Sequence, residues 1–254
     1  MTGSPARAPS DEFFVGYGRA PRRTAGFVAR IILGLTVFVF VLSFALAWSV
    51  QERGGGGFGG GLKLQGRVAA LPYPVLQIFP SVKYPSGHMM LIAGGGKQNI
   101  GSTVARLQGK ALEVRGFLLK RGDIDVIVTD TPGHYTVVAE QAKVAPVKPV
   151  LLGRWRIAGE ICDGKCFAGV MRPGTGLAHK ACANLCIAGD QPAVFSAVRP
   201  VNGASFLLLA GPDGGLPPKS LYDYVALPVE LEGELVRYGD LHVFKVDWSK
   251  VVRQ

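Results

Sequence analysis

The chain has 254 residues, enough for one large domain or two small domains beside a membrane anchor. Its 35 glycines, 17 prolines and 18% charged residues predict many turns and short strands, and they argue against a mainly helical protein. The formal charge is +10, but the basic side chains are scattered and form no dense run interleaved with aromatic residues, so we expect no nucleic-acid partner.

The first predicted element is a transmembrane helix. No charged residue occurs from position 31 to position 50, and a helix of this length spans about 30 Å, the thickness of the hydrocarbon core of a bilayer. We predict an N-terminal cytoplasmic segment at 1–27 and a transmembrane helix at 28–50. A cleaved signal peptide is the alternative, because Ala45-Leu46-Ala47 has the small-x-small form of a cleavage site, although the apolar run is long for such a peptide.

The direction of insertion follows from the basic residues around the apolar stretch. Those that precede it are Arg7, Arg19, Arg22, Arg23 and Arg30, whereas Arg53 is the one cation close after it. Positive residues tend to stay on the cytoplasmic side, so the N-terminus is expected in the cytoplasm and the bulk of the chain on the far side. The sequence therefore predicts a single-pass protein with the lipid bilayer as one partner.

A glycine-rich tether is predicted next. Residues 54–61 read Gly-Gly-Gly-Gly-Phe-Gly-Gly-Gly, a composition that favours a flexible chain over a helix or a packed strand. We place this tether at 51–62, where it would let the exported part adjust its height and tilt over the membrane.

The rest of the chain contains an internal repeat. Residues 91–94 read Leu-Ile-Ala-Gly and residues 208–211 read Leu-Leu-Ala-Gly, and a second block of matches follows at the same separation of 117 positions. Its pairs are Glu113/Glu230, Gly116/Gly233, Leu118/Leu235, Gly122/Gly239, Asp123/Asp240, Val126/Val243 and Asp130/Asp247. The glycine-bearing segments that open the two units, 64–68 and 157–161, are only 93 apart. We therefore predict a duplication with about 24 additional residues early in the second copy.

The repeated segments have the pattern of β-structure. Residues 111–120 alternate, Arg121-Gly122-Asp123 predicts a turn, and residues 124–129 resume with β-branched side chains; residues 227–246 repeat this plan. Short strands with a glycine in the first strand and a late hairpin are typical of a small closed barrel of the OB type, with a β-sandwich as the alternative. The predicted fold class is mainly β, with two tandem OB-like barrels at 63–147 and 148–254 and a Cys/His insertion in the second at about 162–188.

All four cysteines lie in this insertion: Cys162, Cys166, Cys182 and Cys186, with His179 among them. Residues 179–187 are predicted as a short helix that Gly189 ends. On that helix Cys182 and Cys186 are four residues apart and share a face, and His179 lies near the same face.

Three interpretations of this Cys/His cluster remain open. An even cysteine count in an exported domain favours two disulfides of unknown pairing among Cys162, Cys166, Cys182 and Cys186, with no cofactor. Pairing across the two Cys-x3-Cys segments is then easier than closing each one, because two of the cysteines share a helical face. The second interpretation is a zinc or copper site formed by Cys166, His179, Cys182 and Cys186. The third is a redox-active thiol pair, although the chain has no Cys-x-x-Cys at a helix start.

Two segments resemble a bacterial family. Gly159-Glu160-Ile161-Cys162-Asp163, followed by His179-Lys180-Ala181-Cys182-Ala183-Asn184-Leu185-Cys186 and a Gly/Pro turn, is similar to a motif of small exported bacterial domains with a His-x-x-Cys-Ala-x-x-Cys core. Asp11-Glu12-Phe13-Phe14-Val15-Gly16-Tyr17 resembles the start of single-pass inner-membrane proteins with an exported OB-like domain that are associated with respiratory oxidoreductases. The resemblance implies a bacterial inner-membrane protein whose bulk faces the periplasm, and an accessory role in electron transport.

No catalytic motif accompanies these features. The chain contains no Gly-x-Ser-x-Gly and no His-Glu-x-x-His, and we expect that it is not an enzyme. Our first hypothesis is a non-catalytic, membrane-anchored accessory or assembly subunit that docks on other subunits of a membrane complex, such as a respiratory one, at its exported side. The alternative is a periplasmic protein that handles a metal or cofactor through the Cys/His cluster.

Overall fold

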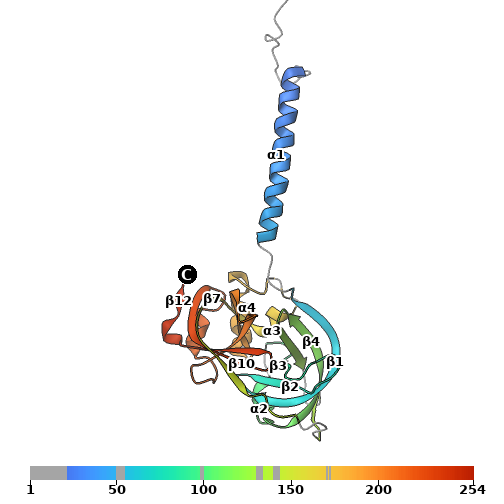
Figure 1. Ribbon diagram of the computed structural model, residues 1–254, viewed down its shortest axis with the longest axis vertical. Coiled ribbons are helices and arrows are strands. Elements are labelled where there is room, and N and C mark those ends of the chain that lie inside the picture. Colours follow the sequence, from blue (N-terminus) through green and yellow to red (C-terminus); the bar gives the residue numbers. More distant parts are fainter. Residues whose placement is uncertain are drawn as a thin grey trace, which may run out of the picture. The chain divides into compact units, whose positions relative to one another are not determined.

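The structure, a computed structural model, describes residues 22–49, 55–97, 100–129, 134–139, 144–169, 171 and 173–254 (Figure 1). The chain divides into two compact units, Met1–Glu52 and Arg53–Gln254. Most of the predicted cytoplasmic segment 1–27, with the family-like residues 11–17, lies outside the described residues, as do residues 51–54 of the predicted tether. We refer to the described part of the second unit as the β domain.

The first unit contributes the helix α1, Arg22–Ser49. Its 28 residues give a length of about 42 Å, and none of its side chains is buried. A helix this long and apolar could span a membrane, and within the described part of the chain it is the one helix that meets both conditions. It begins at Arg22, ahead of the predicted start at 28, because a helix can continue beyond its apolar stretch into residues that water solvates.

Five strands of the β domain close into a first barrel, barrel 1. They are β1 Gly57–Ala70, β2 Pro74–Ile78, β3 Met89–Gly94, β4 Ala111–Arg121 and β5 Ile124–Thr129. The order around the barrel is β1-β2-β3-β5-β4, with β4 paired back onto β1. Neighbouring strands are antiparallel except β3 and β5, which are parallel. The helix α2, Gly101–Ala105, connects β3 to β4, and the short strand β6, Tyr135–Val137, adds to β4.

A second barrel, barrel 2, has the same strand order. Its strands are β7 Pro149–Asp163, β8 Ala193–Val201, β9 Ala204–Ala210, β10 Pro228–Tyr238 and β11 Leu241–Val246. Here β9 and β11 are the parallel pair, and β10 closes onto β7. The smaller elements are α3 Gly164–Ala168, η1 Leu177–His179, α4 Lys180–Ala188, η2 Lys219–Asp223, η3 Trp248–Lys250 and β12 Val252–Arg253. A mainly β protein with an apolar N-terminal helix and two small barrels is thus confirmed.

Residues of the two barrels pair in the same register. Leu91 pairs with Val126 in barrel 1, and Leu208 pairs with Val243 in barrel 2, each residue displaced by 117 positions. The hairpins β4–β5 and β10–β11 keep this displacement along their whole length. The same side chains therefore face the barrel interior at equivalent positions in both barrels.

The first strands of the barrels also correspond, at a displacement of 93. Gly66 of β1 and Gly159 of β7 each approach a neighbouring strand closely. A Cβ atom on Gly66 would overlap the carbonyl oxygen of Gln77, and one on Gly159 would overlap that of Ser196. Both barrels thus require glycine at this position, because any side chain would push the first two strands apart.

The insertion lies between β7 and β8. Gly66 pairs with Ile78 across β1 and β2, whereas Gly159 pairs with Ala197 across β7 and β8, so this connection is 26 residues longer in barrel 2. The β8–β9 connection is two residues shorter than the β2–β3 connection, which accounts for the net difference of 24 seen in the sequence. The predicted helix 179–187 is confirmed as η1 followed by α4, with Gly189 as its C-cap.

β1 begins inside the segment predicted as a tether. Phe58 pairs with Leu119 of β4, and the register then shifts before Gly61. Gly60 has a φ of 75° at this shift, and Gly153 has a φ of 95° at the matching shift of β7. A bulge of this kind needs a left-handed residue, so the glycines of residues 57–61 serve a strand as well as a linker.

One of the two hydrophobic clusters of the β domain joins the two barrels. β2 and β3 are buried on both faces. Leu76 and Ile92 pack in the interior of barrel 1, whereas Val75 and Leu91 pack in a cluster that also contains Leu208 and most of barrel 2. A strand covered on both faces is apolar throughout, which explains why residues 89–93 show no polar alternation.

Candidate metal centre

Asp163 organises the centre at the point where β7 ends and α3 begins. Its Oδ1 accepts a hydrogen bond from the backbone N of Cys166 at 2.8 Å, which caps α3. Its Oδ2 lies 3.0 Å from Nε2 of His179, and both side chains are buried. One carboxylate therefore fixes the backbone of the first cysteine-bearing helix and the ring of the histidine.

Three thiols and the imidazole converge beside this carboxylate. The donor atoms of Cys166, His179 and Cys182 lie within 4.8 Å of one another, and so do those of Asp163, Cys166 and Cys186. Sγ of Cys166 is 3.8 Å from Sγ of Cys186. Cys182 and Cys186 come from successive turns of α4, as their spacing predicts. Either group could hold a metal ion, and together they include the four donors predicted from the sequence and Asp163.

Cys162 lies apart from these donors. Its side chain packs in the main core, and its Sγ is 3.9 Å from the carbonyl oxygen of Glu160. Burial raises the pKa of the Cys162 thiol, and among the described residues it belongs to neither group of converging donor atoms. All four cysteines are free thiols in the structure, and the two-disulfide interpretation stays a prediction.

The surroundings of the cluster favour a thiolate at Cys186 and a thiol at Cys166. The hydrogen bond between Cys166 and Cys186 lowers the pKa of Cys186 to about 7 and raises that of Cys166. Lys97 and Lys165 add to the lowering for Cys186. Nζ of Lys97 is 2.9 Å from Sγ of Cys182 and 3.9 Å from Sγ of Cys186. Because the thiolate is the form that binds metals, these contacts favour cation binding by Cys186 at neutral pH, whereas Cys166 must lose its proton when an ion binds.

Barrel 1 closes one side of the cluster through the loop after β3. Nζ of Lys165 donates to the carbonyl oxygens of Gly94, at 3.1 Å, and Gly96. Nε2 of Gln191 donates to the same Gly94 oxygen at 3.2 Å. The insertion of barrel 2 is thereby fastened to barrel 1, and Lys97 is held within reach of the thiols.

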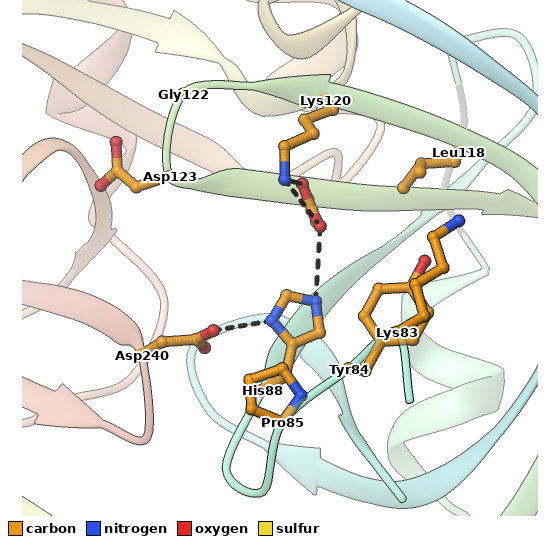
Figure 2. A pocket seen from close by; sticks show the side chains of 10 residues that line it. Lys83, Tyr84, Pro85, His88, Leu118, Lys120, Gly122, Asp123 and Asp240 are labelled. Atoms are coloured by element: carbon orange, nitrogen blue, oxygen red, sulfur yellow. Dashed lines mark hydrogen bonds and ion pairs between the residues drawn. The ribbon is translucent and has the colours of Figure 1, made fainter. Parts of the chain in front are cut away.

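A second contact between the barrels surrounds His88 (Figure 2). Nδ1 of His88 is 2.6 Å from Oδ2 of Asp240, and Nε2 is 3.4 Å from Oδ2 of Asp125, which also pairs with Lys120 at 3.0 Å. The Tyr84 ring stacks on the imidazole with centroids 5.0 Å apart. In Figure 2 dashed lines run from His88 to Asp240 on one side and to the carboxylate bound by Lys120 on the other.

Asp240 binds the backbone on both sides of His88 as well as the His88 side chain. Asp240 belongs to the β10–β11 turn of barrel 2, and its Oδ1 accepts a hydrogen bond from the backbone N of Met89 at 2.8 Å. Its own backbone N donates to the carbonyl oxygen of Gly87 at 3.2 Å. The lining of the adjoining cavity, about 350 Å³ in volume, includes no serine, threonine or cysteine. The His88 contact therefore joins the two barrels through hydrogen bonds and ion pairs.

The four candidate donors were predicted from the sequence, whereas three residues around them were not. Asp163 has a local signal, since an aspartate three residues before Cys166 at a helix start is a typical N-cap. Lys97 and Lys165 have none, because their contacts join segments that lie 69 to 89 positions apart in the chain.

Comparisons of the chain with protein-family models, with curated proteins and with solved structures gave no match. The chemistry that the centre can perform follows from its own donor atoms and their geometry.

Proposed function

We propose that the protein is a membrane-tethered metal-binding protein whose Cys/His cluster takes zinc or Cu(I). The observation that carries this proposal is the 3.8 Å separation between Sγ of Cys166 and Sγ of Cys186. Two sulfurs that are each about 2.3 Å from a tetrahedral ion lie about 3.8 Å apart, whereas the sulfurs of a disulfide lie about 2.05 Å apart. His179 and Cys182 supply the remaining donors, and three thiolates with one imidazole suit a soft or borderline ion.

The contact between Asp163 and His179 supports the same proposal. Histidines that bind metals usually donate their other ring N–H to a carboxylate or carbonyl, which sets the tautomer. With its proton on Nε2 and directed at Asp163, His179 keeps the lone pair of Nδ1 for an ion. The buried carboxylate also offsets part of the charge that a bound cation would bring.

We also propose that α1 anchors the protein in the bacterial inner membrane, with its N-terminus in the cytoplasm and the β domain in the periplasm. The support is the uncharged run from 31 to 50 with five arginines before it. The 28 residues of α1 exceed the length that a bilayer core requires. A thiol-labelling reagent that cannot cross membranes should reach Cys182 in the periplasm of intact cells, and labelling only after lysis would contradict this orientation.

We propose further that both barrels are OB folds derived from one duplicated unit. Supporting this are the closed order 1-2-3-5-4, the parallel third and fifth strands, the helix α2 between the third and fourth strands, and registers displaced by 117 positions. In OB folds the loop between the first two strands commonly contacts the ligand. The Cys/His insertion occupies that loop in barrel 2.

An accessory role in a membrane complex is the second candidate function. Phe58 and Phe117 favour it, because they are exposed by 57% and 46% and their rings lie in contact, tilted by 32°, with centroids 5.4 Å apart. Exposed aromatic pairs are enriched where proteins meet partners. We propose a non-catalytic role at the periplasmic side of a respiratory complex. Mild detergent extraction followed by mass spectrometry should recover stoichiometric partner subunits, and recovery of the chain alone would contradict it.

Metal binding is tested on the full-length protein in detergent, reduced and handled without oxygen. Wild type and Cys162→Ala are expected to bind about one zinc or Cu(I) ion per chain after dialysis, because Cys162 is outside the donor set. The double variant Cys166→Ala/Cys186→Ala should bind none, while circular dichroism confirms that its strands are retained. Equal metal content in both variants, or no metal in the fully reduced wild type, would refute the proposal.

A further inference from the structure

A cavity of about 350 Å³ opens against the thiol of Cys166. Barrel 1 supplies its apolar wall, which consists of Phe58, Phe117, Leu119 and Val128. The insertion supplies the opposite wall, with Cys166, Lys165 and Met171. Met171 is 41% exposed, so this residue of the lining is accessible to solvent. The cavity thus connects solvent with one ligand of the proposed metal centre.

The donor atoms that line this cavity are unusual for a path by which a metal ion enters a protein. Its side-chain donors are two sulfur atoms, the thioether of Met171 and the thiol of Cys166, and no carboxylate, hydroxyl or imidazole belongs to the lining. Thiolates and thioethers select Cu(I), whereas a hydrated hard cation would exchange water for carbon along this path. The chemistry of the wall therefore distinguishes between the ions that the centre itself could accept.

The positive charge of Lys165 also distinguishes between a monovalent and a divalent ion. Its ammonium group is buried and is held by the carbonyl oxygens of Gly94 and Gly96, so it cannot leave the wall without losing these bonds. Coulomb repulsion scales with the charge of the approaching ion, so a fixed ammonium opposes a dication about twice as strongly as a monocation. Lys165 therefore repels Cu(I) in the cavity less strongly than it repels Zn²⁺.

We propose that the centre is loaded with Cu(I) through this cavity, with Met171 as the outer ligand that passes the ion to Cys166. This inference rests on the proposed metal-binding function and specifies its ion. The transfer is a ligand exchange: the bond from copper to the thioether sulfur breaks, a bond to the Cys166 sulfur forms, and the thiol proton passes to solvent. Copper remains Cu(I) throughout, so no oxidant or reductant takes part.

The test follows Cu(I) uptake by the full-length reduced protein from a chromophoric Cu(I) chelator, without oxygen. Met171→Leu keeps an apolar side chain of similar size but removes the sulfur, and it should slow uptake about tenfold while leaving the final copper content unchanged. Met89→Leu is the matched control, because Met89 is buried in β3 beside the His88 contact, and its uptake rate should equal that of wild type. Uptake of Zn²⁺ should be the same in all three proteins.

The possible outcomes distinguish the proposed path of Cu(I) loading from the metal-binding function on which it rests. Zinc bound more tightly than Cu(I), or equal Cu(I) uptake rates in wild type and Met171→Leu, would overturn the copper route while the metal-binding function stands. Failure of the wild-type protein to bind either ion would overturn both.

Discussion

The side chain of His88 lies between a carboxylate of its own barrel and one of the other barrel, and its charge affects both contacts. Burial on its own lowers the pKa of His88, but the interactions with Asp125 and Asp240 outweigh it and raise the pKa to about 9. The folded-state value exceeds the ordinary 6.5, so protonation favours the folded state. This contribution is complete below about pH 6.5 and is lost as the pH rises through about 9.

We expect His88→Gln to remove most of this pH dependence. The difference in free energy of unfolding between wild type and His88→Gln should fall by about 1–2 kcal/mol between pH 6.5 and 9, less than the full shift implies because solvent screens the half-exposed Asp240. Taking the difference removes the contribution of Cys186, whose lowered pKa acts in the opposite direction over this range. Urea unfolding of residues 53–254 at a series of pH values measures the slope. His134→Gln changes an exposed histidine and should leave the slope intact. A difference between wild type and His88→Gln that stays constant or increases over this range would contradict the assignment.

Glycines at close strand crossings have equally local consequences. A Cβ atom on Gly116 would overlap the carbonyl oxygen of Val128, whereas one on Gly61, in the paired strand, would meet nothing within 4 Å. We expect Gly116→Ala to destabilise the β domain by about 1–3 kcal/mol, because the strands must separate. Gly61→Ala should change stability by less than about 0.5 kcal/mol. The urea midpoints of the two variants test this prediction. Equal midpoints would show that the strands accommodate the added Cβ atom of Gly116→Ala without a loss of stability.

At the scale of elements, the insertion depends on Asp163 for its arrangement. The carboxylate receives the backbone N–H of Cys166 and the ring of His179, so α3 and η1 are held by the same side chain. An amide at this position would present N–H groups as well as an oxygen. Facing such an N–H, the His179 ring would carry its proton on Nδ1, and the lone pair needed for an ion would be lost.

Asp163→Asn is therefore expected to weaken metal binding about 10- to 100-fold, with a smaller loss of stability of about 1 kcal/mol from the helix cap. Competition with a chromophoric chelator measures the affinity, and thermal unfolding measures the stability. Asp247→Asn is the matched control, since Asp247 caps η3 in barrel 2 through Ser249 and does not belong to the converging donor atoms. Similar affinities in the two variants would mean that Asp163 does not set the histidine tautomer.

The same elements show what the sequence could and could not predict. The alternation of residues 111–120 and 227–237 predicts the hairpins because each strand has one face in a barrel interior. The spacing of Cys182 and Cys186 predicts their common face because α4 is a local structure. The position of Lys97 beside them could not be predicted, because it depends on how two barrels pack. The early start of β1 was missed because a run of glycines is typical of a linker, yet its partner β4 provides the pairing.

At the scale of the whole β domain, the barrels are joined by a common apolar cluster and by two polar contacts. Val75, Leu91 and Val126 of barrel 1 pack in the same cluster as Leu208 and Val243 of barrel 2. The contact of Lys165 with Gly94 and that of His88 with Asp240 add hydrogen bonds and an ion pair between the barrels. Neither barrel could unfold alone without exposing the outer faces of β2 and β3, which are apolar.

We therefore expect residues 53–254 to unfold in a single cooperative transition. The tryptophans of this fragment, Trp155 and Trp248, both belong to barrel 2, so their fluorescence reports that barrel, whereas circular dichroism reports all strands. Ile92→Ala, which creates a cavity inside barrel 1, should lower stability by about 2–4 kcal/mol and shift both signals to the same urea midpoint. A fluorescence transition that keeps its wild-type midpoint while circular dichroism shifts would show that the barrels unfold independently.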